Sequence, residues 1–266
     1  MATAAQSFRS NRRRADRRPN VEAYQMTNAS EFAQYKALSF DCYGTLIDWE
    51  TGILQALQPW CAWHAIEQSS ETLLLEFGRH ESEVEAEHPA MLYPDVLAQT
   101  LRRLAHTFGE SATDVECAEF GASVGDWPAF ADTSSALRRL AKRFALIIVS
   151  NVDDASFDRS ARRLGVNFAT VVTAEQVGAY KPRLDHFTEL FRRLNDLGIR
   201  RDELLHVAQS LFHDHAPAQS IELPSVWIDR RAGRTGPGAT PRVEVTVAQR
   251  YDSMKSFADA VEASGS

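Results

Sequence analysis

Five short apolar runs, separated by amphipathic segments, constrain the fold of this chain more than any other feature. Each run has four to six residues, a length typical of a buried strand, while apolar residues between the runs recur at helical spacing. Strands that alternate with helices form a parallel sheet covered on both faces. The predicted strands are residues 37–41, 144–149, 168–173, 204–208 and 225–228.

One long segment, residues 55–126, interrupts this alternation because it has a helical pattern and no strand-like run. It separates the first two strands by about 100 residues, far more than a crossover helix needs. We therefore predict an α/β protein with a Rossmann-like, doubly wound parallel sheet and an inserted helical cap domain. The sheet domain takes residues 37–54 and 127–262, and the cap takes residues 55–126.

Charge divides the chain into a basic start and an acidic remainder. Residues 1–20 contain six arginines and one aspartate, so the remaining residues carry −12 of a total net charge of −7. An acidic body does not favour nucleic-acid binding. Residues 1–36 are interpreted as a disordered basic tail, and an organelle transit peptide is the alternative. The start lacks the apolar region of a secretory signal, and no apolar run approaches the roughly 18 residues of a membrane span.

The three cysteines, Cys42, Cys61 and Cys117, are odd in number and widely spaced. This pattern argues against a disulfide framework or a zinc site and favours a reducing compartment. We therefore expect a cytoplasmic protein with no nucleic-acid or membrane partner.

The first predicted strand ends on a carboxylate. The apolar run up to Phe40 leads into Asp41, and Gly44 and Thr45 follow, which predicts a sharp turn at the end of the strand. In open α/β sheets, ligands bind just outside the carboxyl ends of the strands. Asp41 is therefore a candidate nucleophile.

Polar residues also follow the next three predicted strands at the same edge of the sheet. Ser150 and Asn151 end the second strand, Lys181 follows the third, and Asp214 follows the fourth. Each has a simpler interpretation: serine and asparagine form turns, a loop lysine is usually exposed, and aspartate suits a helix N-terminus. Together with Asp41 they predict one site, in which Lys181 would lower the pKa of Asp41.

Two histidines, His213 and His215, flank Asp214 and raise the question of a metal site. Histidines two residues apart on a helix do not face one another, so we expect no metal ligands here.

These four segments resemble, in order and spacing, the four motifs of the haloacid dehalogenase-like hydrolase superfamily. The run from Phe40 to Leu46 is most similar to that of the type II (L-2-haloacid) dehalogenases, and the similarity covers roughly residues 37–262. Superfamily phosphatases usually have a second aspartate where this chain has Tyr43, and an acidic magnesium ligand where it has Gln209. Both differences point away from magnesium-dependent phosphoryl transfer and toward attack on carbon.

The resemblance implies hydrolysis of a small 2-haloalkanoic acid to the 2-hydroxy acid, with inversion, through an aspartyl ester and without a cofactor. Lys181 would keep the nucleophile ionised, and Asp214 would activate water, with His213 as the alternative base. Arg79, in the helical segment, would contact the departing halide. The implied catalytic residues are Asp41, Thr45, Lys181 and Asp214, and the implied substrate-binding residues are Tyr43, Arg79, Ser150 and Asn151.

Two alternatives stay open. One is another hydrolase on the same fold, acting on an ester or phosphate of a larger metabolite, and the other is a non-catalytic binding protein. The chain differs from the dehalogenase pattern in two respects. Phe187 occupies the position of a tyrosine, and Gln209 and Ser210 occupy the place of a serine/asparagine pair. The resemblance also implies a small-molecule substrate and a possible homodimer.

Overall fold

A six-stranded sheet forms the centre of the computed structural model, which describes residues 32–236, 238–241 and 243–264. All neighbouring strands are parallel, in the order β3-β2-β1-β4-β5-β6. The strands span Ala37–Phe40 (β1), Ala145–Ser150 (β2), Thr170–Thr173 (β3), Leu204–Ala208 (β4), Ser225–Ile228 (β5) and Gln249–Tyr251 (β6). The five predicted strands are all present, and β6 is an addition.

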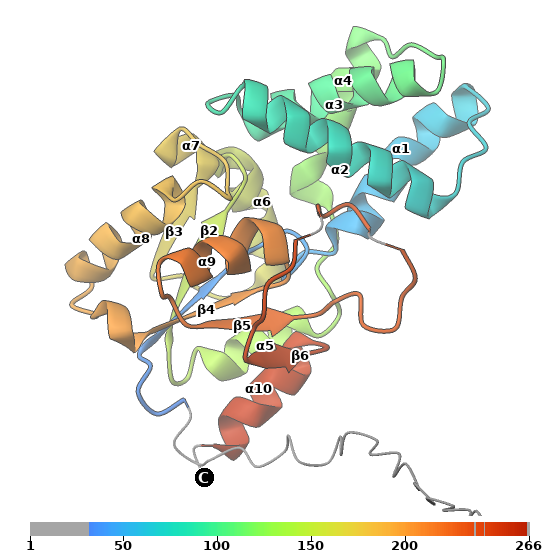
Figure 1. Ribbon diagram of the computed structural model, residues 1–266. Coiled ribbons are helices and arrows are strands. Elements are labelled where there is room, and N and C mark those ends of the chain that lie inside the picture. The colour runs from blue at the N-terminus through green and yellow to red at the C-terminus, as the bar shows by residue number, and fades with distance from the viewer. Residues whose placement is uncertain (1–31, 237, 242, 265–266) are drawn as a thin grey trace, which may run out of the picture.

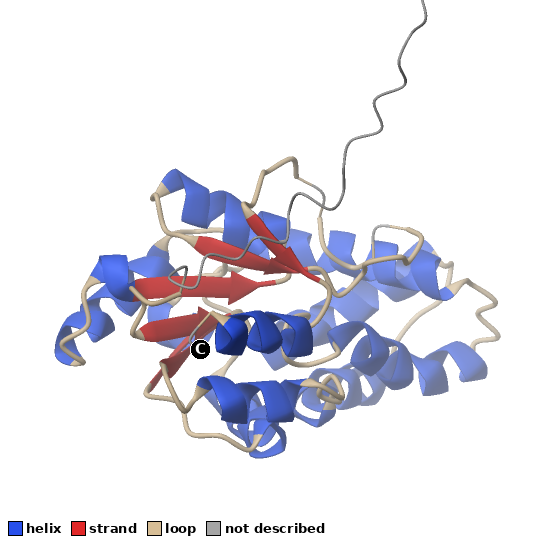
Figure 2. Ribbon diagram, turned by 90° about the horizontal axis from the view of Figure 1, so that it is seen from below, coloured by secondary structure: helices blue, strands red, loops and turns tan. Residues whose placement is uncertain are grey.

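Helices cover both faces of this sheet (Figures 1 and 2). Successive strand residues alternate between the two faces, so that Leu38 and Phe40 join one apolar cluster and Ala37 joins the other. The predicted doubly wound, Rossmann-like sheet is therefore confirmed. One face carries α7 (Ala174–Val177), α8 (Asp185–Asp196) and α9 (Ala216–Ser220), and the other carries α5 (Thr133–Leu140), α6 (Asp154–Leu164) and α10 (Met254–Ala263).

Four helices between β1 and β2 stand over one end of the sheet and are called the helical insert, residues 49–126 (Figure 1). The insert begins six residues before the predicted boundary at residue 55, because the side chain of Asp48 accepts a hydrogen bond from the Thr51 amide and caps the first helix. The helices are α1 (Trp49–Trp63), α2 (Ser70–Glu87), α3 (Tyr93–Thr107) and α4 (Asp114–Ala122), followed by a 3₁₀ turn at Ser123–Asp126.

The long segment between β5 and β6, residues 229–248, reaches from the sheet to the helical insert and is called the β5–β6 connection (Figure 1). Its Arg231 donates hydrogen bonds to Glu50 of α1 (2.5 Å) and to Glu71 of α2 (2.6 Å). Gly78 of α2 lies against the backbone of Ala239, where an added Cβ would be 1.9 Å from the carbonyl oxygen. Ion pairs and backbone packing therefore join the two parts of the molecule.

Most of the predicted N-terminal tail, residues 1–31, lies outside the described residues. The described part already packs on the sheet domain: Phe32 is buried, and its ring lies 5.8 Å from that of Phe257 on α10. Packed structure thus includes residues before the predicted boundary at residue 36. None of the helices in the described ranges combines the length and the apolarity needed to cross a membrane.

Candidate active site

Asp41 follows β1 directly, at the carboxyl edge of the sheet. Its amide donates to the carbonyl of Val207 (3.1 Å), so parallel pairing with β4 continues up to this residue. The chain then turns at Gly44, whose φ of +93° is a conformation that other residues rarely adopt. A Cβ there would also lie 3.1 Å from side-chain atoms of Gln209 and Trp49. Glycine therefore allows the sharp turn that leaves Asp41 at the rim.

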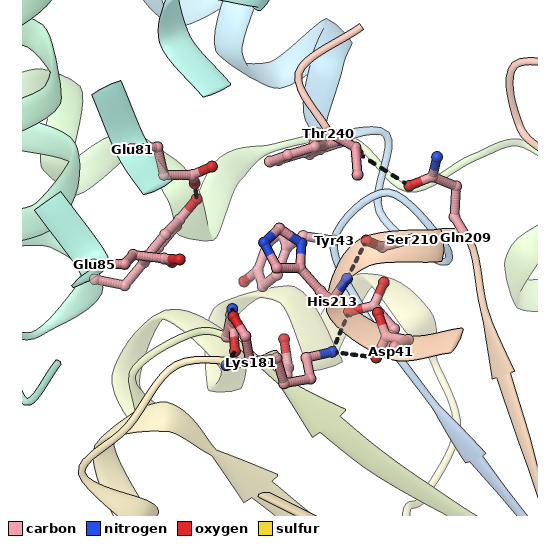
Figure 3. A pocket seen from close by; sticks show the side chains of 14 residues that line it. Asp41, Tyr43, Glu81, Glu85, Lys181, Gln209, Ser210, His213 and Thr240 are labelled. Atoms are coloured by element: carbon pink, nitrogen blue, oxygen red, sulfur yellow. Dashed lines mark hydrogen bonds and ion pairs between the residues drawn. The ribbon is translucent and has the colours of Figure 1, made fainter. Parts of the chain in front are cut away.

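Lys181 joins Asp41 to Asp214, and Figure 3 shows its contact with Asp41. Its Nζ donates to Asp41 Oδ1 (3.0 Å), to Asp214 Oδ1 (2.6 Å) and to the Val149 carbonyl (3.0 Å). The lysine side chain is only 1 % exposed, so its three hydrogen bonds replace its contacts with water. The structure thus brings together three residues that the sequence placed at three different strand ends.

Thr45 and Asn151 hold this cluster in place. The Thr45 hydroxyl donates to Asp41 Oδ2 (2.6 Å) and accepts a hydrogen bond from the Gln209 amide (2.8 Å). Asn151 accepts from the Lys181 amide (2.7 Å) and donates to the Lys181 carbonyl (3.1 Å). Asn151 thus holds Lys181 in place and also lines the cavity, and its predicted contact with substrate stays a prediction.

Behind Asp214 lies His206 of β4, a buried residue that the sequence analysis missed. Its Nε2 is 3.1 Å from Asp214 Oδ1, and its Nδ1 is 2.9 Å from the Ser39 hydroxyl on β1. An ionised carboxylate can only accept, so Nε2 carries the proton in this contact. The sequence did offer a signal for His206, because it is a histidine inside an otherwise apolar predicted strand.

Burial and charge act differently on the two aspartates. Burial opposes the ionisation of Asp214, but Lys181 and His206 outweigh it and hold the pKa of Asp214 well below its usual value. Burial also raises the pKa of Asp41; the Lys181 charge lowers it only in part, and the Asp214 charge raises it further. Lys181 therefore acts on Asp41 in the predicted direction, but the net pKa of Asp41 is raised.

A cavity of about 30 Å³ lies between this cluster and the helical insert. By this measure it holds roughly two or three water molecules, so its size suits a small substrate. Three polar atoms of cavity-lining residues are buried without a hydrogen-bond partner in the described parts of the chain: Ser150 Oγ, Asp214 Oδ2 and His213 Nε2. Burial lowers the pKa of His213 to about 4, so its imidazole is neutral near pH 7.

Tyr43 forms part of the cavity wall (Figure 3). Its ring packs edge-on against Trp127, with 5.8 Å between the ring centroids, and lies 6.5 Å from Tyr93. The hydroxyl is hydrogen-bonded to Ser160 Oγ on α6 (2.9 Å). Tyr43 therefore offers the cavity an aromatic surface, with its hydroxyl already engaged.

Arg79 does not line the cavity, so the structure does not bring it together with the other predicted site residues. Its side chain is 47 % exposed and pairs with Glu76 (2.8 Å) and Glu83 (2.9 Å) on the outer side of α2. The physical reason is helical periodicity: the buried stripe of α2 runs through Leu74 and Phe77, and position 79 falls outside it.

That same stripe carries two glutamates that the sequence analysis missed. Glu81 and Glu85 are 3 % and 7 % exposed and line the cavity from α2 (Figure 3). Burial raises the pKa of Glu81 to about 7, although the Tyr93 hydroxyl donates to it. Burial and the charge of Glu81 together raise the pKa of Glu85 well above its usual value. Phe77, Glu81 and Glu85 follow one another at intervals of four residues, which places them on the same face of a helix. This spacing could have identified the two glutamates from the sequence.

These residues do not fit a magnesium ion. Magnesium takes carboxylate oxygens and water in octahedral geometry, but the Lys181 ammonium group lies between Asp41 and Asp214. Gln209 stands at the position of the acidic ligand and contacts Thr240 (3.4 Å). In the described ranges, no group of three or more histidine, cysteine or carboxylate side chains is placed to hold a metal ion.

Comparison with known proteins identifies the family. The model of the haloacid dehalogenase-like hydrolase family matches residues 35–208. No curated protein sequence matches the chain.

Several solved structures share the fold. The L-2-haloacid dehalogenase from Xanthobacter autotrophicus has a TM-score of 0.71 at 18 % identity, covering 86 % of this chain and 98 % of that one. The defluorinating L-2-haloacid dehalogenase Rha0230 also has a TM-score of 0.71, at 16 % identity, with coverage of 86 % and 95 %. YfnB from Bacillus subtilis, in a magnesium-bound structure, has a TM-score of 0.68 at 16 % identity, with coverage of 86 % and 99 %.

Proposed function

The chain belongs to the haloacid dehalogenase-like hydrolase family, and on that premise we propose that it hydrolyses a carbon–halogen bond through a covalent ester on Asp41. The observation that carries this proposal is the buried cluster of Asp41, Lys181 and Asp214 beneath a small cavity. Nucleophilic catalysis of this kind divides one difficult displacement into two easier steps.

In the first step, a carboxylate oxygen of Asp41 attacks the carbon that bears the halogen. The new C–O bond forms as the C–halogen bond breaks, the halide leaves with the bonding electrons, and the carbon is inverted. Lys181 and Thr45 hold the two oxygens of Asp41 and so orient the attack. The helical insert serves as a cap that keeps water from the carbon.

In the second step, water attacks the carbonyl carbon of the ester. Asp214 accepts a proton of this water at Oδ2, the oxygen that has no hydrogen-bond partner among the described residues. Lys181 stabilises the negative charge that develops on the former Asp41 oxygen. The bond between the ester carbonyl carbon and the oxygen that attacked the substrate breaks, and the alcohol leaves with that oxygen and takes up the proton held by Asp214. Asp41 retains one oxygen from water and releases the remaining proton.

The sequence and the L-2-haloacid dehalogenases among the structural neighbours make a 2-haloalkanoic acid the first substrate class to assay. The test is halide release from racemic 2-chloropropionate in ¹⁸O water, with and without EDTA, followed by mass spectrometry of the peptide that contains Asp41. We expect EDTA-resistant release, consumption of one enantiomer, and ¹⁸O in Asp41 after a single turnover. Asp41→Asn should abolish release, whereas Asp158→Asn, an exposed helical control, should not.

Release of halide without ¹⁸O in Asp41 would contradict the ester intermediate. If the chain releases no halide but releases phosphate from p-nitrophenyl phosphate with added magnesium, the phosphate-ester alternative replaces this proposal.

A further inference from the structure

The cavity has an excess of carboxyl groups over cations. Lys181 is the one lysine or arginine among its lining residues, and its Nζ is already bonded to Asp41, Asp214 and a backbone carbonyl. On the opposite wall stand Glu81 and Glu85 (Figure 3). A substrate carboxylate placed between these walls would find no free lysine or arginine side chain to pair with, whereas a cation would meet carboxyl groups on both sides.

Glu85 is an unpartnered group aimed at the cavity. It is 7 % exposed, its carboxyl group points into the cavity in Figure 3, and it has no hydrogen bond to any described residue. Ser150, on the opposite side, is fully buried, and its hydroxyl likewise has no partner in the described ranges. Buried polar groups normally have hydrogen-bond partners. The Glu85 carboxyl group and the Ser150 hydroxyl therefore mark two positions where polar groups of a ligand would bind.

Aromatic rings complete the wall that carries the two glutamates. Tyr43, Trp49 and Tyr93 line the same cavity. Aromatic faces and carboxylates together form the environment that binds organic ammonium groups, because the ring quadrupole and the carboxylate charge attract the same cation. A metal ion is a poorer fit, since the described residues contain no suitable ligand set.

We propose that the cavity binds a small organic ammonium group between Glu81, Glu85 and the three aromatic rings, with the reacting carbon turned toward Asp41. The orientation of the carbon rests on the ester chemistry proposed above. Small halogenated amines are then the preferred substrate class, ahead of the 2-haloalkanoic acids assayed above. The reaction consumes one water and yields the amino alcohol, a halide ion and a proton.

Three unreactive probes of similar shape test this proposal: isobutylammonium, isobutyramide and isobutyrate, each titrated calorimetrically into the full chain. We expect isobutylammonium to bind at least about tenfold more tightly than isobutyrate, with the amide between them. Glu85→Gln should weaken ammonium binding about tenfold. Glu83→Gln, the same change on the outer side of α2, should leave it unchanged.

The pH dependence gives an independent readout. Glu81 is faced by Glu85 on its own helix, by Tyr93 from α3 and by Tyr180 from the loop after α7, and Lys181 of that loop acts on Glu85. Ammonium affinity should rise as pH increases through about 7, because Glu81 then ionises while an alkylammonium stays charged. Glu81→Gln should remove this rise.

Tighter binding of isobutyrate than of isobutylammonium would overturn the inference, and so would unchanged ammonium affinity in a folded Glu85→Gln variant. Circular dichroism establishes folding, and Glu81→Gln provides a second variant of the same wall. These titrations involve no turnover. A failed ammonium site therefore leaves the ester chemistry of Asp41 standing, and failure of the ¹⁸O experiment leaves the binding result intact.

Discussion

Lys181 supplies the positive charge that balances two buried carboxylates. It is 1 % exposed, and Asp41 and Asp214 have no other cationic partner as close to them in the described residues. Lys181→Met keeps much of the side-chain length and removes the charge. We expect loss of turnover and destabilisation by about 3–5 kcal/mol at pH 7, because the carboxylates are left without their cation. Urea unfolding, followed by fluorescence, measures this change.

The stability loss in Lys181→Met should depend on pH. Lys181 lowers the folded-state pKa of Asp214, so this pair stabilises the protein above the unfolded pKa of about 3.8 and the contribution is lost as pH falls below it. The difference between native chain and variant should therefore persist down to about pH 4 and shrink near pH 2. Lys142→Met, an exposed control, should show no difference at either pH. An equal loss at both pH values would argue against charge as the cause.

Glu81 should make the protein less stable at high pH. Burial raises its folded-state pKa from 4.5 to about 7, so the folded state holds a proton that the unfolded state releases between these values. Stability falls as pH rises through this window. Glu81→Gln should remove the part of that fall that comes from Glu81 and stabilise the protein by about 1–3 kcal/mol at pH 8, with little change at pH 4.

Denaturant unfolding at several pH values measures this effect, with Glu83→Gln as the exposed control. A Glu81→Gln variant that loses stability at pH 8 would show that the ionised carboxylate has a partner of opposite charge.

The sequence predicted part of the candidate site because strand ends in a parallel sheet converge on one edge. Asp41, Lys181 and Asp214 follow strands of one parallel sheet, so they lie close together irrespective of the details of side-chain packing. Arg79 was assigned by resemblance, without regard to the helical period that turns it outward. Glu85 could have been identified from that period, but its lack of a partner depends on three-dimensional packing.

At the scale of elements, α2 contacts the β5–β6 connection through Gly78. In an exposed helix, replacing glycine by alanine stabilises by about 1 kcal/mol. Here the new methyl group would lie 1.9 Å from the carbonyl oxygen of Ala239, so the backbones must separate. We expect Gly78→Ala to destabilise by about 1–3 kcal/mol and to lower the melting temperature.

The neighbouring change Arg79→Ala is the control for this experiment, since Arg79 is half exposed and makes only surface ion pairs. It should alter stability by less than about 0.5 kcal/mol and leave turnover intact. A more stable Gly78→Ala protein would mean that α2 and Ala239 are not in contact in solution.

Elements with strong apolar patterns were predictable, and the others were not. β4 and β5 have the predicted bounds because their runs are apolar and end at turn-forming residues. β6 has only three residues, Gln249–Tyr251, and lies at the sheet edge with partly exposed side chains, so it leaves no apolar run. The start of α1 was missed because its first turn is set by Asp48, a cap without apolar periodicity.

At the scale of the whole molecule, the topology of the sheet determines where the site lies, but it does not determine which side chains line the site. A parallel sheet with its site at the carboxyl edge follows from the order of strands and helices, and structures at 16–18 % identity share it. The helical insert supplies a different set of side chains to the cavity, namely Trp49, Glu81, Glu85 and Tyr93. Shared fold and substrate class are therefore separate questions for this chain.

The cavity lies between the sheet domain and the helical insert, so access to it depends on what holds these two parts together. Arg231 of the β5–β6 connection contacts both Glu50 of α1 and Glu71 of α2, and its side chain is only 12 % exposed. Arg231→Gln should weaken this link by about 1–3 kcal/mol. Amide hydrogen exchange in α1 and α2 should accelerate while exchange in β1 and β2 stays unchanged, because the sheet keeps its own contacts.

Arg234→Gln is the matched control, since Arg234 lies on the same connection but is 52 % exposed and reaches Glu50 only at 3.6 Å. It should leave exchange in both helices unchanged. Faster exchange throughout Arg231→Gln would mean that the ion pairs stabilise the molecule as one unit, and unchanged exchange would mean that packing at Gly78 holds the insert. Only selective acceleration in the insert identifies Arg231 as the residue that controls its separation from the sheet, and hence the entry of substrate to Asp41.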